Sequence, residues 1–201
     1  MRAAWGEAFD AKRGRICAAV EATAGQVLRF EGAPAFTAFH SSSAGFTEDC
    51  GAIWSSLPYL VSVSSPEDEG SVPGYVSTVE RSALDFRDTL LSVAPEADFS
   101  GAPETWVGEI RRDASGRVSE TVIGGAVFLG VKLRELFALR STAFDLAFID
   151  GVFRFTVTGF GHGVGMSQYG ANVMAAQGAD YRTILAHYYP GTELVSLESG
   201  E

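Results

Sequence analysis

The stretch GFGHGVGMSQYGA, residues 159–171, places a glycine at every second position from Gly159 to Gly165, around a single histidine. In an extended strand, this alternation would leave one face without side chains, so that another backbone, an aromatic ring or a ligand must approach it. The fingerprints G-x-G-x-x-G and G-x-x-x-x-G-K-[ST] fit no register here, which disfavours a phosphate-binding loop. Two interpretations remain open, a tight packing corner and a ligand groove.

Polar residues follow the glycines where a helix is expected to begin. Ser167 and Gln168 would present a hydroxyl and an amide beside unpaired backbone N–H groups. Such groups, with aromatic rings and little positive charge nearby, suit an uncharged, hydroxyl-rich ligand such as a sugar. His162 is a candidate to orient a sugar or a carboxylate, and packing against the glycines is the alternative.

The other histidines and the cysteines give weaker signals. His40 ends an alternating segment and is expected to anchor the core or a loop, and His187 is expected on a helix surface or in helix packing. Three histidines without metal spacing predict no zinc site, and we expect no metal and no cofactor. Cys17 and Cys50 form no C-x-x-C pair, so a disulfide and two free thiols both remain open.

Acidic residues gather in two loops, one around Glu48 and one at residues 67–69. We expect them to be solvated, because nothing apolar flanks them that would raise a pKa. Glu48 is the acid to test if the chain is an enzyme on its own. The serines Ser41–Ser43 lack a surrounding G-x-S-x-G, which argues against a serine hydrolase.

Hydrophobic periodicity and turn residues predict an α+β fold with antiparallel hairpins and several short helices. Helices are expected over 2–22, from a cap at Ser82 through Leu91, and over 130–139, 166–177 and 181–188. Hairpins are expected over 26–30 with 35–40, 106–112 with 117–123, and 144–149 with 152–158, and single strands over 59–63 and 75–80. The last hairpin has the strongest signal, because Asp150-Gly151 suits a type I′ turn.

Composition excludes some partners. The 201 residues carry a net charge of −10, and no basic stripe exists that could bind a nucleic-acid backbone, so no nucleic-acid partner is expected. No apolar run approaches the roughly 20 residues that span a bilayer, so no membrane span is expected. The start MRAAWGEAFDAKRGR has no signal-peptide core, so we expect either a cytosolic protein or a chain that lacks its natural beginning.

Two long stretches resemble a known family. GFGHGVGMSQYGANVMAAQGADYRTILAHYYPGTEL is similar to the closing motif of the stage II sporulation protein D family. AVEATAGQVLRFEGAPAFTAFHSSSAGFTEDCGAIWSSLPYLVSVSSPED resembles its central block, with a histidine-serine start, a threonine, a tryptophan and Pro-Tyr-Leu. The matches cover residues 18–69 and 159–194. They imply a family core over 1–70 and 140–201, with an inserted α+β subdomain over 71–139.

The resemblance implies an activity and a location. The family's founding activity is that of a lytic transglycosylase, which cleaves peptidoglycan strands between N-acetylmuramic acid and N-acetylglucosamine and leaves a 1,6-anhydro end. The implied partners are peptidoglycan glycan strands and other sporulation wall hydrolases, in the extracytoplasmic cell envelope. One carboxylic acid suffices, first protonating the glycosidic oxygen and then acting as base toward the sugar's own 6-hydroxyl.

The resemblance also sets limits on activity. The family's acid is a glutamate in a block reading roughly E-A-L-K-A-Q-A-x-A-A-R-T-Y, which residues 1–17 do not match. We therefore expect a glycan-binding portion that is inactive alone. The alternatives are a non-catalytic wall-binding accessory protein and a self-standing hydrolase that uses Glu48. The zinc-binding cluster of some relatives would also lie upstream, so no metal is expected.

The expected substrate-binding residues come from the matching motifs. Tyr59 of the Pro-Tyr-Leu element is the first groove candidate, with strand packing as its alternative. The other candidates belong to the histidine-serine start and to the glycine-rich motif: His40, Ser41, His162, Ser167 and Gln168. The sequence departs from the family's usual pattern at Ala44, which implies a slightly altered loop, and at Val61, where relatives often have a polar or basic residue, which weakens the expectation of sugar contact there.

Overall fold

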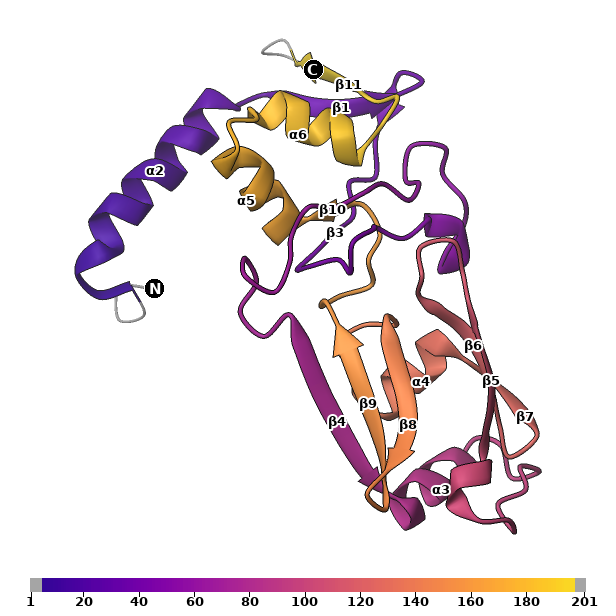
Figure 1. Ribbon diagram of the computed structural model, residues 1–201. Helices are drawn as coiled ribbons and strands as arrows, with labels where there is room; N and C mark the ends of the chain where they lie inside the picture. The colour runs from indigo at the N-terminus through magenta and orange to yellow at the C-terminus, as the bar shows by residue number, and fades with distance from the viewer. Residues whose placement is uncertain (1–4, 198–201) are drawn as a thin grey trace. The chain divides into compact units, whose positions relative to one another are not determined.

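A computed structural model describes residues 5–197 and confirms the α+β class (Figure 1). The chain divides into two compact units. The smaller contains the described residues 5–35 and 192–197, and the larger contains residues 36–191. The predicted division at residues 70 and 140 stays a prediction.

The smaller unit joins a helix to a three-stranded antiparallel sheet. A short turn of 3-10 helix, η1 (Gly6–Ala8), leads into α2 (Phe9–Ala22); residues 2–4 of the predicted helix lie outside the described residues. The sheet has the order β11 (Glu193–Ser196), β1 (Gln26–Phe30), β2 (Ala33–Pro34). The expected pairing of β1 with 35–40 is wrong, because Glu31 and Gly32 both adopt positive φ and reverse the chain within two residues.

The larger unit contains the predicted central hairpin. β8 (Phe144–Ile149) and β9 (Val152–Thr158) are joined through Asp150 and Gly151, both at positive φ, which confirms the type I′ turn. β4 (Val76–Ser82) pairs antiparallel on the other side of β9. α3 (Ala83–Leu91) begins where the Ser82 side chain accepts a hydrogen bond from the Asp85 N–H, so the predicted cap is confirmed.

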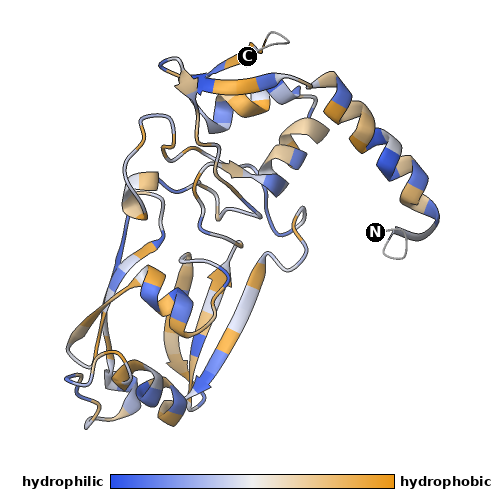
Figure 2. Cartoon of the chain, turned by 180° about the vertical axis from the view of Figure 1, so that it is seen from behind, coloured by the Kyte–Doolittle hydropathy of each residue, from blue (hydrophilic) through white to orange (hydrophobic). Residues whose placement is uncertain are grey.

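A second sheet contributes to the same core. β5 (Val107–Arg112) and β6 (Val118–Ile123) form the predicted hairpin, and β7 (Ala126–Leu129) adds a strand that the sequence analysis missed. α4 (Gly130–Leu136) follows it and ends earlier than expected. Figure 2 shows hydrophobic and hydrophilic residues alternating along the strands, as expected for sheets with one buried face. Phe86 and Phe153 stack in this core with ring centroids 3.8 Å apart.

Between these sheets and the last two helices, the chain is mostly irregular. β3 (Phe39–His40) pairs in parallel with β10 (Met166–Ser167), so α5 (Gln168–Ala176) begins two residues later than predicted. α6 (Tyr181–Tyr188) has its predicted bounds. Two 3-10 turns, η2 (Cys50–Ala52) and η3 (Pro103–Thr105), complete the elements.

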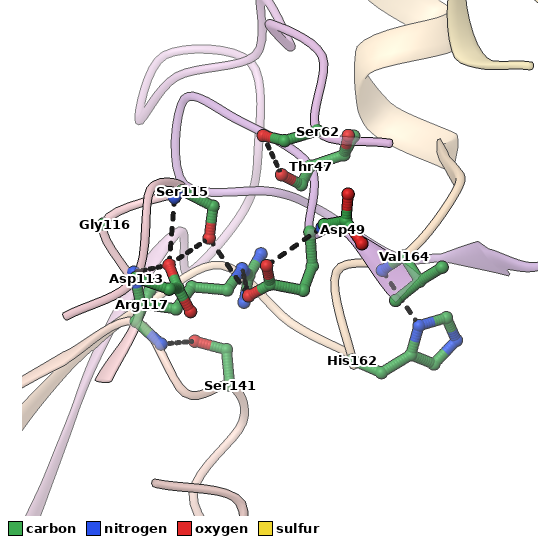
Figure 3. Close-up of polar contacts among 12 residues, drawn as sticks. Thr47, Asp49, Ser62, Asp113, Ser115, Gly116, Arg117, Ser141, His162 and Val164 are labelled. Carbon is green, nitrogen blue, oxygen red and sulfur yellow. Dashed lines mark hydrogen bonds and ion pairs between the residues drawn. The ribbon is translucent and has the colours of Figure 1, made fainter. Parts of the chain in front are cut away.

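The predicted strand over 59–63 is wrong. This segment lies beside residues 45–50, but the pairing is broken by side-chain hydrogen bonds. The Thr47 hydroxyl accepts the Val63 N–H at 2.9 Å. The Ser62 hydroxyl donates to the Thr47 carbonyl at 2.6 Å (Figure 3). Short polar side chains that bind nearby backbone in this way compete with a regular ladder.

Candidate functional site

The glycine-rich segment is a loop and not a strand, which corrects the sequence expectation. Gly159, Gly161, Gly163 and Gly165 all have φ between 71° and 121°, a region that side chains rarely adopt. The alternation in the sequence therefore reflects backbone conformation at every second residue. Val164, between two of these glycines, is fully buried.

Each glycine allows another group to approach closely. A Cβ at Gly159 would lie 2.7 Å from the Ser42 carbonyl oxygen, and one at Gly161 would lie 2.7 Å from His40 Cβ. At Gly163 it would lie 2.5 Å from Arg117 Cζ. Since these neighbours are backbone or buried side chains, the glycines serve packing, which was one of the two open interpretations.

His40 is held in one protonation state and one tautomer beneath this loop. Its ring is 4% exposed, with Nδ1 3.3 Å from the Val164 carbonyl oxygen and Nε2 2.6 Å from Ser43 Oγ. Burial, and then the nearby Arg117 charge, lower its pKa to about 3, so the ring is neutral. Because a carbonyl can only accept, Nδ1 carries the hydrogen and Nε2 accepts from the Ser43 hydroxyl.

Glu67 connects the loop that contains Ser41–Ser43, called the serine loop below, to α5. Its Oε1 accepts the Ser43 N–H at 2.6 Å and the Ser167 hydroxyl at 2.5 Å. Ser167 also caps α5 by accepting the Gly170 N–H at 3.1 Å. Glu67 is 3% exposed, so the expectation of a solvated loop acid is wrong for it, because hydrogen-bond donors from two segments converge on its carboxylate.

A second buried cluster joins Glu48 to Arg117. Glu48 Oε2 lies 3.7 Å from Arg117 Nε, and the two residues are 3% and 1% exposed. The expectation of a solvated Glu48 is therefore also wrong, because residues distant in the sequence enclose it. Burial, and then the nearby Asp113 charge, raise the pKa of Glu48 to about 7.

One serine hydroxyl lies between the two carboxyl groups of this cluster. Ser115 Oγ lies 2.7 Å from Asp113 Oδ1 and 3.0 Å from Glu48 Oε2 (Figure 3). Asp113 Oδ1 also accepts the Ser115 and Arg117 N–H groups. A serine has one hydrogen to donate. When Ser115 donates it to Asp113, a protonated Glu48 can donate in turn to Ser115, which agrees with the raised pKa of Glu48.

The pocket beside this cluster has a volume of about 240 Å³. Its polar lining includes Glu48, Asp113 and Thr142, and its apolar lining includes Ile53 and Leu129. A protonated Glu48 at neutral pH has the chemistry of a general acid. Sequence reasoning missed Asp113, Ser115 and Arg117, since a turn with sequence DASGR looks like any solvated hairpin turn.

The predicted groove residues mostly lie under the surface. Tyr59 is 5% exposed, and its hydroxyl accepts the Phe36 N–H at 2.8 Å. Half-buried His162 accepts the Val164 N–H on Nδ1 at 3.0 Å, and burial lowers its pKa. Its ring lies 5.0 Å from the exposed ring of Trp54 and 5.8 Å from that of His40.

The remaining candidates lie near the start of α5. The Ser41 carbonyl accepts the Tyr169 N–H at 3.1 Å, and Gln168 is exposed at the first position of the helix. The structure thus brings the histidine-serine segment and the glycine loop together, as the sequence candidates require. The substrate-binding roles of all six stay predictions.

Similarity to known proteins extends along nearly the whole chain. The chain is 38% identical over 201 residues to stage II sporulation protein D of Bacillus amyloliquefaciens, which covers 99% of this chain and 56% of that protein. Identity to the Bacillus subtilis (strain 168) protein of that name is also 38%, over 196 residues, 96% of this chain and 55% of the relative. The Bacillus subtilis (strain 168) protein called amidase enhancer is 28% identical over 229 residues, 89% of this chain and 32% of the relative. No protein-family model matches the chain.

The fold and the site define an α+β protein with two buried carboxyl clusters. One is formed around Glu67 by the serine loop and the start of α5, and the other joins Glu48 to the turn between β5 and β6. By its matches, the chain belongs to the stage II sporulation protein D family, a sporulation-related family. It spans about half the length of the curated relatives it matches. Among residues 5–197, no helix is long and apolar enough to cross a membrane, and no three metal-binding side chains come together.

Proposed function

We propose that this chain is the glycan-strand-binding portion of a peptidoglycan lytic transglycosylase that acts in sporulation or in cell-wall remodelling. The observation that carries the proposal is the 38% identity to stage II sporulation protein D across nearly the whole chain. The work would take place in the extracytoplasmic cell envelope. Glycan strands are the substrate, and other wall hydrolases are the partners.

Two features of the larger unit support a carbohydrate ligand. Exposed aromatic rings lie where the serine and glycine segments meet: Phe160 forms a bridge with Ser42, and Trp54 lies beside His162. Glu48 beside the pocket is the acid within this chain that could protonate a glycosidic oxygen. Because the family's glutamate block has no match in this sequence, binding without cleavage is the expected behaviour of the chain alone.

The test is to incubate the chain with denuded glycan strands, measure co-sedimentation, and search for 1,6-anhydro ends by mass spectrometry. We expect strands to bind without release of anhydro ends. Failure to bind strands would refute the proposal. Release of anhydro ends that Glu48→Gln abolishes, while strand binding persists, would place the activity in this chain.

A non-catalytic role is the second candidate, and the similarity to the protein called amidase enhancer favours it. In that role the chain would bind glycan strands and increase the activity of a wall amidase. Adding the chain to a wall amidase and purified cell wall would then increase the release of peptides. No 1,6-anhydro ends would form in any wall fraction tested.

A further inference from the structure

Two large aromatic rings lie exposed side by side in the larger unit. Phe36 is 56% exposed and Trp54 is 44% exposed, with ring centroids 6.1 Å apart in an edge-to-face arrangement. The centroid of the half-buried His162 ring lies 5.0 Å from that of Trp54. Adjacent exposed aromatic rings of this kind often mark a binding surface.

The Trp54 loop is built around a buried sulfur. Cys50 is fully buried, its carbonyl accepts the Trp54 N–H at 2.7 Å, and its Sγ accepts the Leu57 N–H at 3.0 Å. The Cys50 thiol also donates to the Ser55 carbonyl. These bonds fix the backbone on both sides of Trp54, so that binding would cost little ordering of the loop.

The neighbours of Trp54 are fixed as well. The Tyr59 hydroxyl accepts the Phe36 N–H, which sets the backbone of that residue. His162 is bound through Nδ1 by the Val164 N–H, and burial lowers its pKa, so its ring is an uncharged support. Tyr59 and His162, which the sequence analysis proposed as ligand contacts, thus position the two exposed rings.

The loop that carries Trp54 has polar residues on both sides of it and contains no lysine or arginine. Asp49 Oδ1 accepts the Gly51 N–H at 2.7 Å, and the Ser56 side chain lies against the same glycine. No lysine or arginine occurs between residues 30 and 80. Carboxylate and hydroxyl groups beside aromatic faces suit hydroxyl-rich, uncharged ligands, whereas phosphates and acidic peptides would find no cation in this segment.

We propose that Trp54, supported by His162 and flanked by Phe36, is a stacking platform for one uncharged sugar ring of a glycan strand. The proposal rests on the glycan-binding function proposed above. The C–H groups on one face of a pyranose carry a slight positive charge and match the negative face of an indole ring. Asp49 and Ser56 would accept and donate hydrogen bonds at the hydroxyl rim.

The test follows the indole N–H signals of Trp5, Trp54 and Trp106 by NMR. The variant Trp54→Phe identifies the Trp54 signal by its loss. A tetramer of β-1,4-linked N-acetylglucosamine and denuded glycan strands are titrated separately. We expect the Trp54 signal to shift with both ligands. Trp54→Ala should weaken strand binding at least tenfold and Trp54→Phe less, whereas Tyr181→Ala, a control aromatic on α6, should stay within twofold.

The outcomes separate the platform from the function on which it rests. If the wild type binds strands and Trp54→Ala binds them equally well, the platform is wrong and the glycan-binding function stands. The same holds if binding shifts another indole and leaves Trp54 unchanged. If the wild type binds no strands, both proposals fail, and capture of an apolar protein segment by Trp54 would then identify a different occupant. Thermal unfolding checks each fold, and Trp54→Phe carries the test if Trp54→Ala unfolds.

Discussion

Arg117 Nε and Glu48 Oε2 lie 3.7 Å apart, close enough for an ion pair but too far for a hydrogen bond. No hydrogen-bond acceptor among residues 5–197 reaches any of the three guanidinium nitrogens of Arg117. Burial lowers the pKa of Arg117. The Asp113 carboxylate, joined by Glu48 once it ionises above its pKa of about 7, therefore compensates a charge that has lost its water, and this dependence makes the cluster sensitive to substitution and to pH.

Arg117→Ala should destabilise the protein by roughly 3–5 kcal/mol, because it leaves the carboxyl groups of Glu48 and Asp113 without their cation and opens a space beside Gly163. Urea unfolding followed by circular dichroism measures the change. The matched control is Arg111→Ala, which removes exposed ion pairs to Glu109 and Glu120 and should cost less than about 1 kcal/mol. Equal costs for the two variants would show that the buried cluster has no special role.

Glu48→Gln should change how stability depends on pH. The pKa of Glu48 rises from 4.5 to about 7 on folding, so its protonated form is favoured in the native state. The wild type therefore loses stability as the pH rises from 4.5 to 7, by roughly 3 kcal/mol in all. The Glu48→Gln variant lacks this loss, because a glutamine side chain does not titrate. The stability of the variant relative to wild type should be higher at pH 8 than at pH 4. A difference that is constant across this range would contradict the raised pKa.

His40→Gln should have the opposite dependence. Burial lowers the pKa of His40 from 6.5 to about 3, so the neutral ring stabilises the fold above pH 6.5, and this contribution fades as the pH falls toward 3. The advantage of wild type over the variant should be greatest near pH 8 and should shrink in acid, by roughly 5 kcal/mol at most. Urea midpoints at several pH values measure it. An advantage as large at pH 4 as at pH 8 would show that His40 is not held neutral.

Between pH 4.5 and 6.5, the contributions of His40 and Glu48 to stability change in opposite directions. There the wild type gains stability from His40 as the pH rises and loses it from Glu48. Glu48→Gln should therefore unmask a steeper loss of stability in acid than the wild type shows. The double variant with His40→Gln, as the control, should remove most of that slope.

Gly163→Ala should destabilise the fold far more than a matched glycine substitution. Gly163 and Gly116 have similar positive φ angles, 88° and 82°, so the conformational strain of alanine is nearly the same. At Gly116 nothing lies within 4 Å of the added methyl, whereas at Gly163 it would meet the Arg117 guanidinium at 2.5 Å. We expect about 1 kcal/mol at Gly116 and roughly 3 kcal/mol or more at Gly163, from thermal unfolding. Equal losses of stability in the two variants would mean that the positive φ alone explains why position 163 is a glycine.

The sequence alone determined the elements whose signals are local. The Asp150-Gly151 turn, the Ser82 cap and the bounds of α6 depend on residues within a few positions of one another, and the structure agrees with each. The α+β class followed from the same patterns. The family resemblance, carried by two long motifs, is supported by identity across almost the whole chain.

Tertiary structure alone decided the environments of the charged residues. Glu48 was expected in solvent because its sequence neighbours are small and polar, yet it is enclosed by Arg117 and Ser115, which lie more than 60 positions away. The alternating glycines were interpreted as an extended strand because spacing does not encode the sign of φ. Burial, pKa and backbone handedness depend on contacts between distant segments, and a linear sequence specifies those contacts only through the fold.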